Sequence, residues 1–463
     1  MRRVLILLLS LLPATLTLLS CGYSAPASSQ GGSGLKYRAF ITNGVSAGTG
    51  SAAAYLLDAQ KDMRANAAPI SAGSTPGMIV LTPNKTQSLI FSGNGTRFSD
   101  NQLTFVNNAA ETASTHLILP GPTESIVVSP DGSAAYTAVP TAQVIGQSPG
   151  LLKAIALSSD TVTGEVDVPA LRYLAINNSG NRILGFSDVL ASLGAPCDAT
   201  PSFLFVITPS NIGITSCPAV PVPGFNFPFD HPVAAFFSSD DSTAYVVNCG
   251  AECGGSQASV QKFEMTPALC LPDGVCPPVN VDAASVALVN GSTMYLAGTP
   301  VPASPCTGQP TAATTCGLLS TVDLSSMTVI NSGVTITDGY HNRIALGANG
   351  QLFIGAHTCT EIVPPVPPPP GAETRGCLSI YNTLSTPVGK VAAGGVVIPA
   401  ANGDVTGIEP ISKRTVAYVA QGGALSIYDT AFDGLSNNPN DSGHPGQIFA
   451  LVGYFIDVKV IDF

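Results

Sequence analysis

The chain has 463 residues, of which 10% are charged and 45% are apolar, and its formal net charge is −11. Its 18 lysines and arginines form no basic run, which excludes a nucleic-acid partner, because binding to phosphates needs clustered Lys and Arg. The apolar content excludes a disordered chain. The abundance of Gly, Ala, Ser, Thr, Val and Pro is typical of β-structure with many turns.

Residues 1–21 predict an export signal. Arg2 and Arg3 precede an apolar stretch, residues 4–19, which Pro13 interrupts and which is too short and broken to favour a spanning helix. Residues 22–35 are rich in Gly, Ser and Ala, so we expect a flexible tether there. The remainder, residues 36–463, is expected to form a single domain.

The signal ends in Leu18-Leu19-Ser20-Cys21, which resembles the lipobox of bacterial lipoproteins. The resemblance implies cleavage before Cys21 and a lipid on that cysteine. The protein would then be anchored to the bilayer of the bacterial cell envelope, at the outer membrane or the cell surface, without spanning it. The alternative is an ordinary cleaved signal in which Cys21 carries no lipid.

One unit recurs along residues 36–463: an apolar strand, a short polar turn, and a second strand that leaves through an aromatic or aliphatic residue. Examples are SPDGSAAYTAV (129–139), SSDDSTAYVVN (238–248) and PISKRTVAYVAQ (410–421). Such a unit cannot bury its own apolar face, whereas a ring of units can. The turns fall at Asn84-Lys85, Asp131-Gly132, Ser179-Gly180, Asp240-Asp241, Asn290-Gly291, Asn349-Gly350 and Lys413-Arg414.

A third strand also repeats, as LSIYNT (378–383) and LSIYDT (425–430) show, and each copy ends before a tight turn. Residues 37–43 and 55–60 look like the second and third strands of a unit that lacks its first strand, and residues 455–463 form an alternating strand with no strand after it. Pairing these two ends would close a ring and protect its edges. The prediction is an all-β β-propeller of four-stranded antiparallel blades. We expect eight blades; seven is the alternative, because the sequence of the fourth blade is irregular.

The second strands Phe40-Ile41-Thr42-Asn43, Tyr136-Thr137-Ala138-Val139, Tyr245-Val246-Val247-Asn248 and Tyr418-Val419-Ala420-Gln421 resemble the YVTN-type β-propeller repeat of bacterial and archaeal surface proteins. The resemblance spans roughly residues 36–463. It implies an exported binding or surface-layer module, although the wider group includes lactonases and quinoprotein-like folds.

The chain has 11 cysteines, and setting aside Cys21 leaves ten that fall as neighbours in the sequence. Because export permits disulfides, we expect five local bridges: Cys197 with Cys217, Cys249 with Cys253, Cys270 with Cys276, Cys306 with Cys316, and Cys359 with Cys377. The alternative for one blade is a zinc site made of Cys249, Cys253, Cys270 and Cys276.

The segments between second and third strands carry most of the extra length, whereas the turns of the repeat stay short. These long segments are residues 140–150, 187–202, 299–317 and 357–377. They would elaborate one face of the propeller, and long loops on a rigid scaffold usually carry recognition. Residues 363–370 (VPPVPPPP) would form a stiff polyproline projection, a spacer or a ligand for an aromatic groove.

Polar candidates for a site near the axis are expected in the segments that lead into first strands. They are His116, Asp230, His231, Asp338, His341 and Asp404, with His357 at the end of a second strand. Converging His and Asp side chains could act as acid and base or hold a metal, and the catalytic candidates are His231, His341, Asp338 and Asp404.

Asp433, Asn438, Asn440 and Asp441 are candidate calcium ligands, although the EF-hand spacing is absent and an ordinary turn-rich loop is the alternative. Residues 47–51 (AGTGS) lack a lysine and a following helix, so no phosphate site is expected.

Three functional hypotheses follow. The first is a lipid-anchored binding module whose long loops contact a protein or carbohydrate of the cell envelope. The second is an enzyme of the lactonase or quinoprotein-like kind with a site at the channel mouth, and the third is a structural envelope protein. We expect a monomer without a cofactor, more a binding protein than an enzyme.

Overall fold

The computed structural model describes residues 32–44, 52–93, 100–265, 274–302, 315–360, 377–388, 391–399, 403–430, 434–435 and 454–462. Several predicted features lie outside these residues: the export signal with Cys21, most of the tether, residues 47–51, the polyproline tract, Cys270, Cys306 and the candidate calcium ligands. Within the described ranges, no helix has the length and apolar character needed to cross a bilayer.

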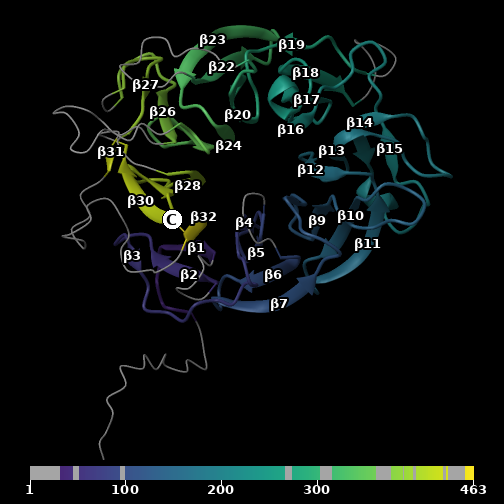
Figure 1. Cartoon of the computed structure of the whole chain (residues 1–463). Helices are drawn as coiled ribbons and strands as arrows, with labels where there is room; N and C mark the ends of the chain where they lie inside the picture. The colour runs from purple at the N-terminus through teal and green to yellow at the C-terminus, as the bar shows by residue number, and fades with distance from the viewer. Residues whose placement is uncertain are drawn as a thin grey trace, which may run out of the picture.

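Eight four-stranded antiparallel sheets follow one another around a common axis (Figure 1). The protein is an eight-bladed β-propeller. The fold confirms the predicted class and the count of eight, and the alternative of seven blades is wrong. The described residues also include two short 3-10 helices in connections between strands, η1 (Pro209–Asn211) after β14 and η2 (Gly250–Cys253) after β17.

Each blade has strands A to D, from the axis outward. The A strands are β32 (Tyr454–Asp462), β4 (Met78–Leu81), β8 (Ser125–Val128), β12 (Leu171–Ile176), β16 (Pro232–Phe237), β20 (Val286–Asn290), β24 (Tyr340–Leu346) and β28 (Val405–Pro410), for blades 1 to 8. The B strands, in the same order, are β1 (Arg38–Gly44), β5 (Gln87–Phe91), β9 (Ala134–Val139), β13 (Ile183–Ala191), β17 (Thr243–Asn248), β21 (Thr293–Gly298), β25 (Gln351–His357) and β29 (Val416–Gln421).

The outer half of each blade is made of strands C and D. The C strands are β2 (Ala53–Asp58), β6 (Gln102–Asn107), β10 (Leu151–Ala156), β14 (Ser202–Ile207), β18 (Ser259–Glu264), β22 (Gly317–Asp323), β26 (Leu378–Asn382) and β30 (Ala424–Asp429). The D strands are β3 (Met63–Arg64), β7 (Thr112–Ile118), β11 (Thr161–Asp167), β15 (Ala219–Pro221), β19 (Val279–Asn280), β23 (Thr328–Ile336), β27 (Val396–Val397) and β31 (Gly434–Leu435).

All seven predicted turns lie between an A strand and the following B strand. The turn between β8 and β9 shows why these residues are used. Gly132 has a φ of 72°, which a side chain would disfavour, and Asp131 accepts hydrogen bonds from the Ser133 backbone N–H and the Ser129 hydroxyl. The turn is therefore specified by its own few residues.

Apolar side chains are buried between blades. Eight clusters each combine residues from two adjacent blades; for example, Phe91 and Phe105 of blade 2 pack with Val139 and Ile155 of blade 3. A single blade would leave these faces exposed to water, so the ring is the smallest unit that buries them all.

The two ends of the chain meet in blade 1. Strand β32 pairs antiparallel with β1, and the register places Ile41 opposite Val458 and Asn43 opposite Phe455. Figure 1 shows the yellow C-terminal strand beside the purple N-terminal one. The predicted closure is confirmed, and it leaves no open edge at the junction between the first and last blades.

One predicted boundary was wrong. The segment after the B strand of blade 4 was expected to begin at residue 187, but β13 continues to Ala191. The register shifts between Phe186 and Ala191, so the extension bulges away from the pairing with β14.

Candidate functional site

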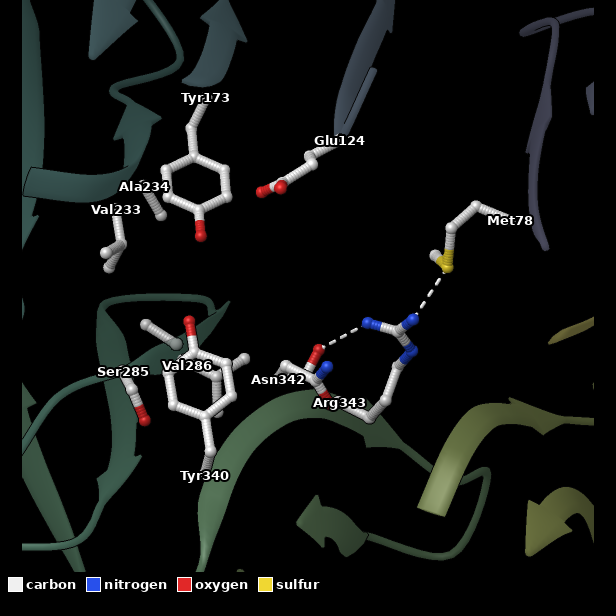
Figure 2. Close-up of a pocket in the computed structure, with 11 residues that line it drawn as sticks. Met78, Glu124, Tyr173, Val233, Ala234, Ser285, Val286, Tyr340, Asn342 and Arg343 are labelled. Atoms are coloured by element: carbon white, nitrogen blue, oxygen red, sulfur yellow. Dashed lines mark hydrogen bonds between the residues drawn. The ribbon is translucent and has the colours of Figure 1, made fainter. Parts of the chain in front are cut away.

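We call the side of the ring where the A strands begin the loop face, because the D–A and B–C segments lie there. A cavity of about 190 Å³, the axial pocket, lies where the A strands of blades 2 to 7 begin (Figure 2). It is lined by Met78, Glu124, Tyr173, Val233, Ala234, Ser285, Val286, Ala287, Tyr340, Asn342 and Arg343. The pocket therefore lies on the same side of the propeller as the long segments.

Two tyrosines from blades 4 and 7 meet in this pocket. The hydroxyl groups of Tyr173 and Tyr340 point toward each other in Figure 2. Burial, and then the neighbouring Tyr340, raise the pKa of Tyr173 well above its usual value. Its hydroxyl therefore stays protonated at neutral pH and can serve as a hydrogen-bond donor.

The carboxylate in the pocket already has a partner. Glu124 accepts a hydrogen bond of 2.6 Å from Arg172 Nε, and the same guanidinium contacts Asp188 at 2.9 Å. The Arg172 guanidinium also lies 5.1 Å from the centre of the Tyr173 ring. This pair neutralises Glu124 and holds the side of the pocket that Tyr173 occupies.

Arg343, from β24, lies on another side of the pocket. Its Nε donates to the Thr406 carbonyl at 2.5 Å, one terminal nitrogen donates to the Asn342 carbonyl at 2.8 Å, and the other contacts the Met78 sulfur at 2.6 Å. Burial lowers the pKa of Arg343, while Asp457 acts in the opposite direction. An arginine remains charged nevertheless, so the pocket contains a cation.

The predicted aspartates hold loop segments in place. Asp230 accepts hydrogen bonds of 2.8 Å from the backbone N–H groups of Ser256 and Gln257. Burial raises the pKa of Asp230, but hydrogen bonds led by that from Gln257 outweigh it, and the pKa is lowered. The ionised carboxylate of Asp230 therefore holds the segment between β17 and β18 in place by hydrogen bonds.

Asp338 and Asp404 have the same kind of partners. Asp338 accepts from the Thr360 N–H at 2.8 Å and from the Thr315 hydroxyl at 2.9 Å, and Asp404 accepts from the Thr358 N–H at 2.6 Å. Each aspartate therefore connects a D–A segment to a B–C segment, which gives it a structural role.

The predicted histidines lie in three different settings. His231 contacts Asp230 at 3.1 Å and packs on Phe203, with 4.9 Å between ring centres. His357 Nδ1 lies 3.7 Å from Asp404, and burial, followed by the charge of Arg343, lowers its pKa. His341 is fully buried, and burial lowers its pKa to about 4, so it is neutral at pH 7.

His116 does not lie near the axis, contrary to the prediction. It is on β7, the outermost strand of blade 2, where its ring contacts Gln102 and Thr104 of the neighbouring strand. The alternating pattern of residues 112–118, with every second side chain exposed, is the signal that could have identified an outer strand.

The structure brings two predicted pairs together, Asp230 with His231 and His357 with Asp404, but it does not place the four catalytic candidates in the axial pocket. In the part of the chain that the structure describes, no group of three or more His, Cys, Asp or Glu is arranged to hold a metal ion. The residues that do converge are Tyr173, Tyr340 and Arg343. Sequence analysis missed these three residues. They could have been identified as polar or aromatic residues near the start of predicted A strands, because A strands line the axis of a propeller.

Three predicted disulfides are present: Cys197–Cys217, Cys249–Cys253 and Cys359–Cys377. Cys276 and Cys316 are also disulfide-bonded. Since Cys249, Cys253 and Cys276 are oxidised, they cannot supply thiolates, and the zinc alternative is wrong. The disulfides indicate an oxidising, extracellular environment.

Large apolar side chains are exposed on the loop face. Ile145, Val189, Leu190, Phe225 and Val301 are between 51% and 103% exposed, and all lie in B–C or D–A connections or at the end of β13. Other large apolar side chains are exposed away from this face, such as Ile214 between β14 and β15 and Val329 and Ile330 in β23. The five residues of the loop face lie in long connections or beside them, which makes that face a candidate interaction surface.

No family model and no curated protein sequence matches this chain. Among solved structures it is similar to dihydro-heme d1 dehydrogenase NirN in complex with DHE, with a TM-score of 0.59 and 11% identity over 92% of this chain and 76% of that one. It is also similar to hydrazine synthase of Kuenenia stuttgartiensis, with a TM-score of 0.50 and 11% identity over 77% of this chain and 96% of that one. At this identity the similarity shows the propeller fold alone.

Proposed function

We propose that this protein is a lipid-anchored β-propeller of the bacterial cell envelope, of the YVTN type, that binds another macromolecule through its loop face. Three features support the proposal: the lipobox-like sequence ending at Cys21, the disulfides, and the long segments gathered on one face. The anchor would leave the propeller free to meet a partner in the envelope.

The observation that carries the proposal is the exposure of Ile145, Val189, Leu190, Phe225 and Val301 on that face. Apolar side chains of this size favour a protein partner over a carbohydrate, because they gain free energy when another apolar surface covers them. The Cys249–Cys253 and Cys359–Cys377 bridges lie in B–C connections and reduce the entropy that these segments would lose on binding.

An enzyme with a site at the channel mouth is the second candidate, and the axial pocket is the observation in its favour. Of its predicted catalytic residues, Asp338 and Asp404 are, however, engaged with backbone and hydroxyl groups of neighbouring loops. A general base must be able to reach a substrate proton, so this arrangement favours binding over catalysis.

The loop face can be tested by capture from envelope extract with the purified exported protein. Val189→Ser with Leu190→Ser, and separately Phe225→Ser, should reduce capture of the same partner roughly tenfold. Ile214→Ser, which removes an equally exposed side chain away from the loop face, is the matched control. Equal capture by all variants would rule out this face as the binding surface.

The anchor is tested separately, by metabolic labelling with an alkyne fatty acid followed by detergent-phase partition. The wild-type protein should incorporate label and enter the detergent phase, whereas Cys21→Ser should do neither. Label in the Cys21→Ser variant, or none in the wild type, would contradict the proposed anchor.

A further inference from the structure

Arg343 differs in its partners from three other arginines of the ring, Arg38, Arg172 and Arg414. Arg38, Arg172 and Arg414 each contact a carboxylate at 2.6 Å. Arg343 has no carboxylate within ion-pair distance among the described residues, and its partners are two carbonyl oxygens and a sulfur.

Counting donors shows what remains for a ligand. A guanidinium has five N–H groups, and the contacts to Thr406, Asn342 and Met78 account for three, of which the sulfur is a weak acceptor. Two N–H groups are therefore without a partner among the described residues. These donors lie on a partly buried cation that lines the pocket, and a bound anion would accept charge-assisted hydrogen bonds from them.

Nearby acidic groups do not take this role. Asp457 attracts Arg343, but its carboxylate accepts the backbone N–H groups of Ile79 and Val458, each at 2.9 Å, and lies 3.9 Å from Lys459. Lys459 in turn pairs with Glu409 at 3.2 Å. Glu124, which lines the same pocket, is paired with Arg172.

The rest of the pocket defines the size and character of a ligand. Tyr173 and Tyr340 lie across the pocket from the Arg343 guanidinium, with Val233 and Ala234 near them, and Val286 also lines the pocket (Figure 2). A volume of about 190 Å³ lies below the ~300–1,000 Å³ of sites for drug-sized ligands, so it suits only a small molecule.

We propose that the axial pocket binds a small organic carboxylate, with its carboxylate on the two unpartnered N–H groups of Arg343 and its apolar part toward the tyrosine, valine and alanine side chains on the other side of the pocket. Arginine presents its donors as a planar fork that matches a carboxylate. This site is independent of the partner proposed for the loop face, because the ligand lies inside the ring.

The test is calorimetric titration of the purified exported protein with benzoate, with acetate as a smaller probe, and with benzamide, the neutral analogue of benzoate. Benzoate should bind at least about tenfold more tightly than benzamide, since only benzoate carries the charge. Equal binding of benzoate and benzamide, or no binding of either carboxylate, would show that the proposal is wrong.

Variants locate the site. Arg343→Met should weaken benzoate binding about tenfold or more, and Arg343→Lys should recover part of that loss. Tyr173→Ala and Tyr340→Ala each remove a ring from the wall that the apolar part of the ligand would contact, so each should weaken binding by a smaller factor. These variants keep Arg343 and therefore test the pocket even if Arg343→Met does not fold. Arg182→Met, in an A–B turn at the opposite end of β12, is the control and should bind like wild type. Wild-type affinity in the Arg343 and tyrosine variants would place the carboxylate elsewhere.

Discussion

Arg38 Nε donates a hydrogen bond of 2.6 Å to Asp462, a residue 424 positions further along the chain. The same guanidinium donates to the Asn108 carbonyl at 2.7 Å and to Glu111 at 2.9 Å. Arg38 therefore joins the first and last strands of the propeller and ties both to blade 2. Ring closure thus has a polar contact in addition to the β32–β1 ladder.

Replacing Arg38 with Met should destabilise the protein by about 2 kcal/mol, because it leaves the carboxylate of Glu111, whose side chain is 7% exposed, without its cation. The free energy of unfolding in urea measures the effect. Arg182→Met is the matched control, because the Arg182 guanidinium donates to the carbonyl of the adjacent Asn181 and has no carboxylate within ion-pair distance among the described residues. A loss no larger than that of the control would mean that Arg38 does not secure the closure.

His341 should make the fold sensitive to acid. The imidazole is fully buried, its nitrogens make no hydrogen bond of good geometry, and burial lowers its pKa from 6.5 to about 4. The unfolded chain therefore takes up a proton more readily than the folded one below pH 6.5. Stability should be unaffected above that pH and should fall by up to about 3 kcal/mol as the pH drops from 6.5 to 4.

The contribution of His341 can be isolated with His341→Leu, measured by urea denaturation over the same pH range. The variant should lose less stability than wild type between pH 6.5 and 4, and the two curves should run parallel above pH 7. Curves that stay parallel throughout would show that His341 is not the responsible group.

Glu252 should give the stability a pH dependence opposite to that from His341. Burial raises the pKa of Glu252 from 4.5 to about 7, against the hydrogen bonds from the Thr299 N–H and the Ser285 hydroxyl. The folded protein binds this proton more tightly than the unfolded chain, so its stabilising effect is present below pH 4.5 and is lost as the pH rises to 7. Because the carboxylate is only partly shielded from water, the change should be about 1–3 kcal/mol.

Glu252→Gln removes this titration while keeping a hydrogen-bonding group of similar shape. Relative to wild type, the variant should gain stability steadily between pH 4.5 and 7, as measured by thermal denaturation at fixed ionic strength. A difference that does not change with pH would contradict the assignment.

Each disulfide should increase the free energy of unfolding by an amount that grows with the length of chain that it closes. Cys359–Cys377 closes 18 residues and Cys249–Cys253 closes 4. Replacing both cysteines of a pair with serine should cost about 3 kcal/mol for the first and about 2 kcal/mol for the second, if the bridges act mainly on the unfolded chain.

Alkylation before and after reduction, followed by mass measurement, checks the pairing itself. All ten cysteines after Cys21 should react only after reduction. Free thiols at several of these positions in the exported protein would contradict the predicted set of five bridges.

The sequence alone determined the repeat, its turns and the closure of the ring, and it favoured eight blades over seven. Each of these depends on short-range information: Asp131-Gly132 specifies its turn by local hydrogen bonding and backbone conformation, and the alternating strand β32 matches β1 because both have buried apolar positions. Neighbouring cysteines such as Cys249 and Cys253 were paired correctly for the same reason.

Only the tertiary structure decided which side chains share the axis and what each one contacts. Tyr173 and Tyr340 meet because the ring places the starts of β12 and β24 around one pocket, a distance that no local pattern encodes. The aspartates Asp230, Asp338 and Asp404 could have pointed at that pocket, but the loops gave them backbone N–H and hydroxyl partners instead. Among the described residues, no carboxylate lies within ion-pair distance of Arg343, and this depends on how the neighbouring blades are placed around it.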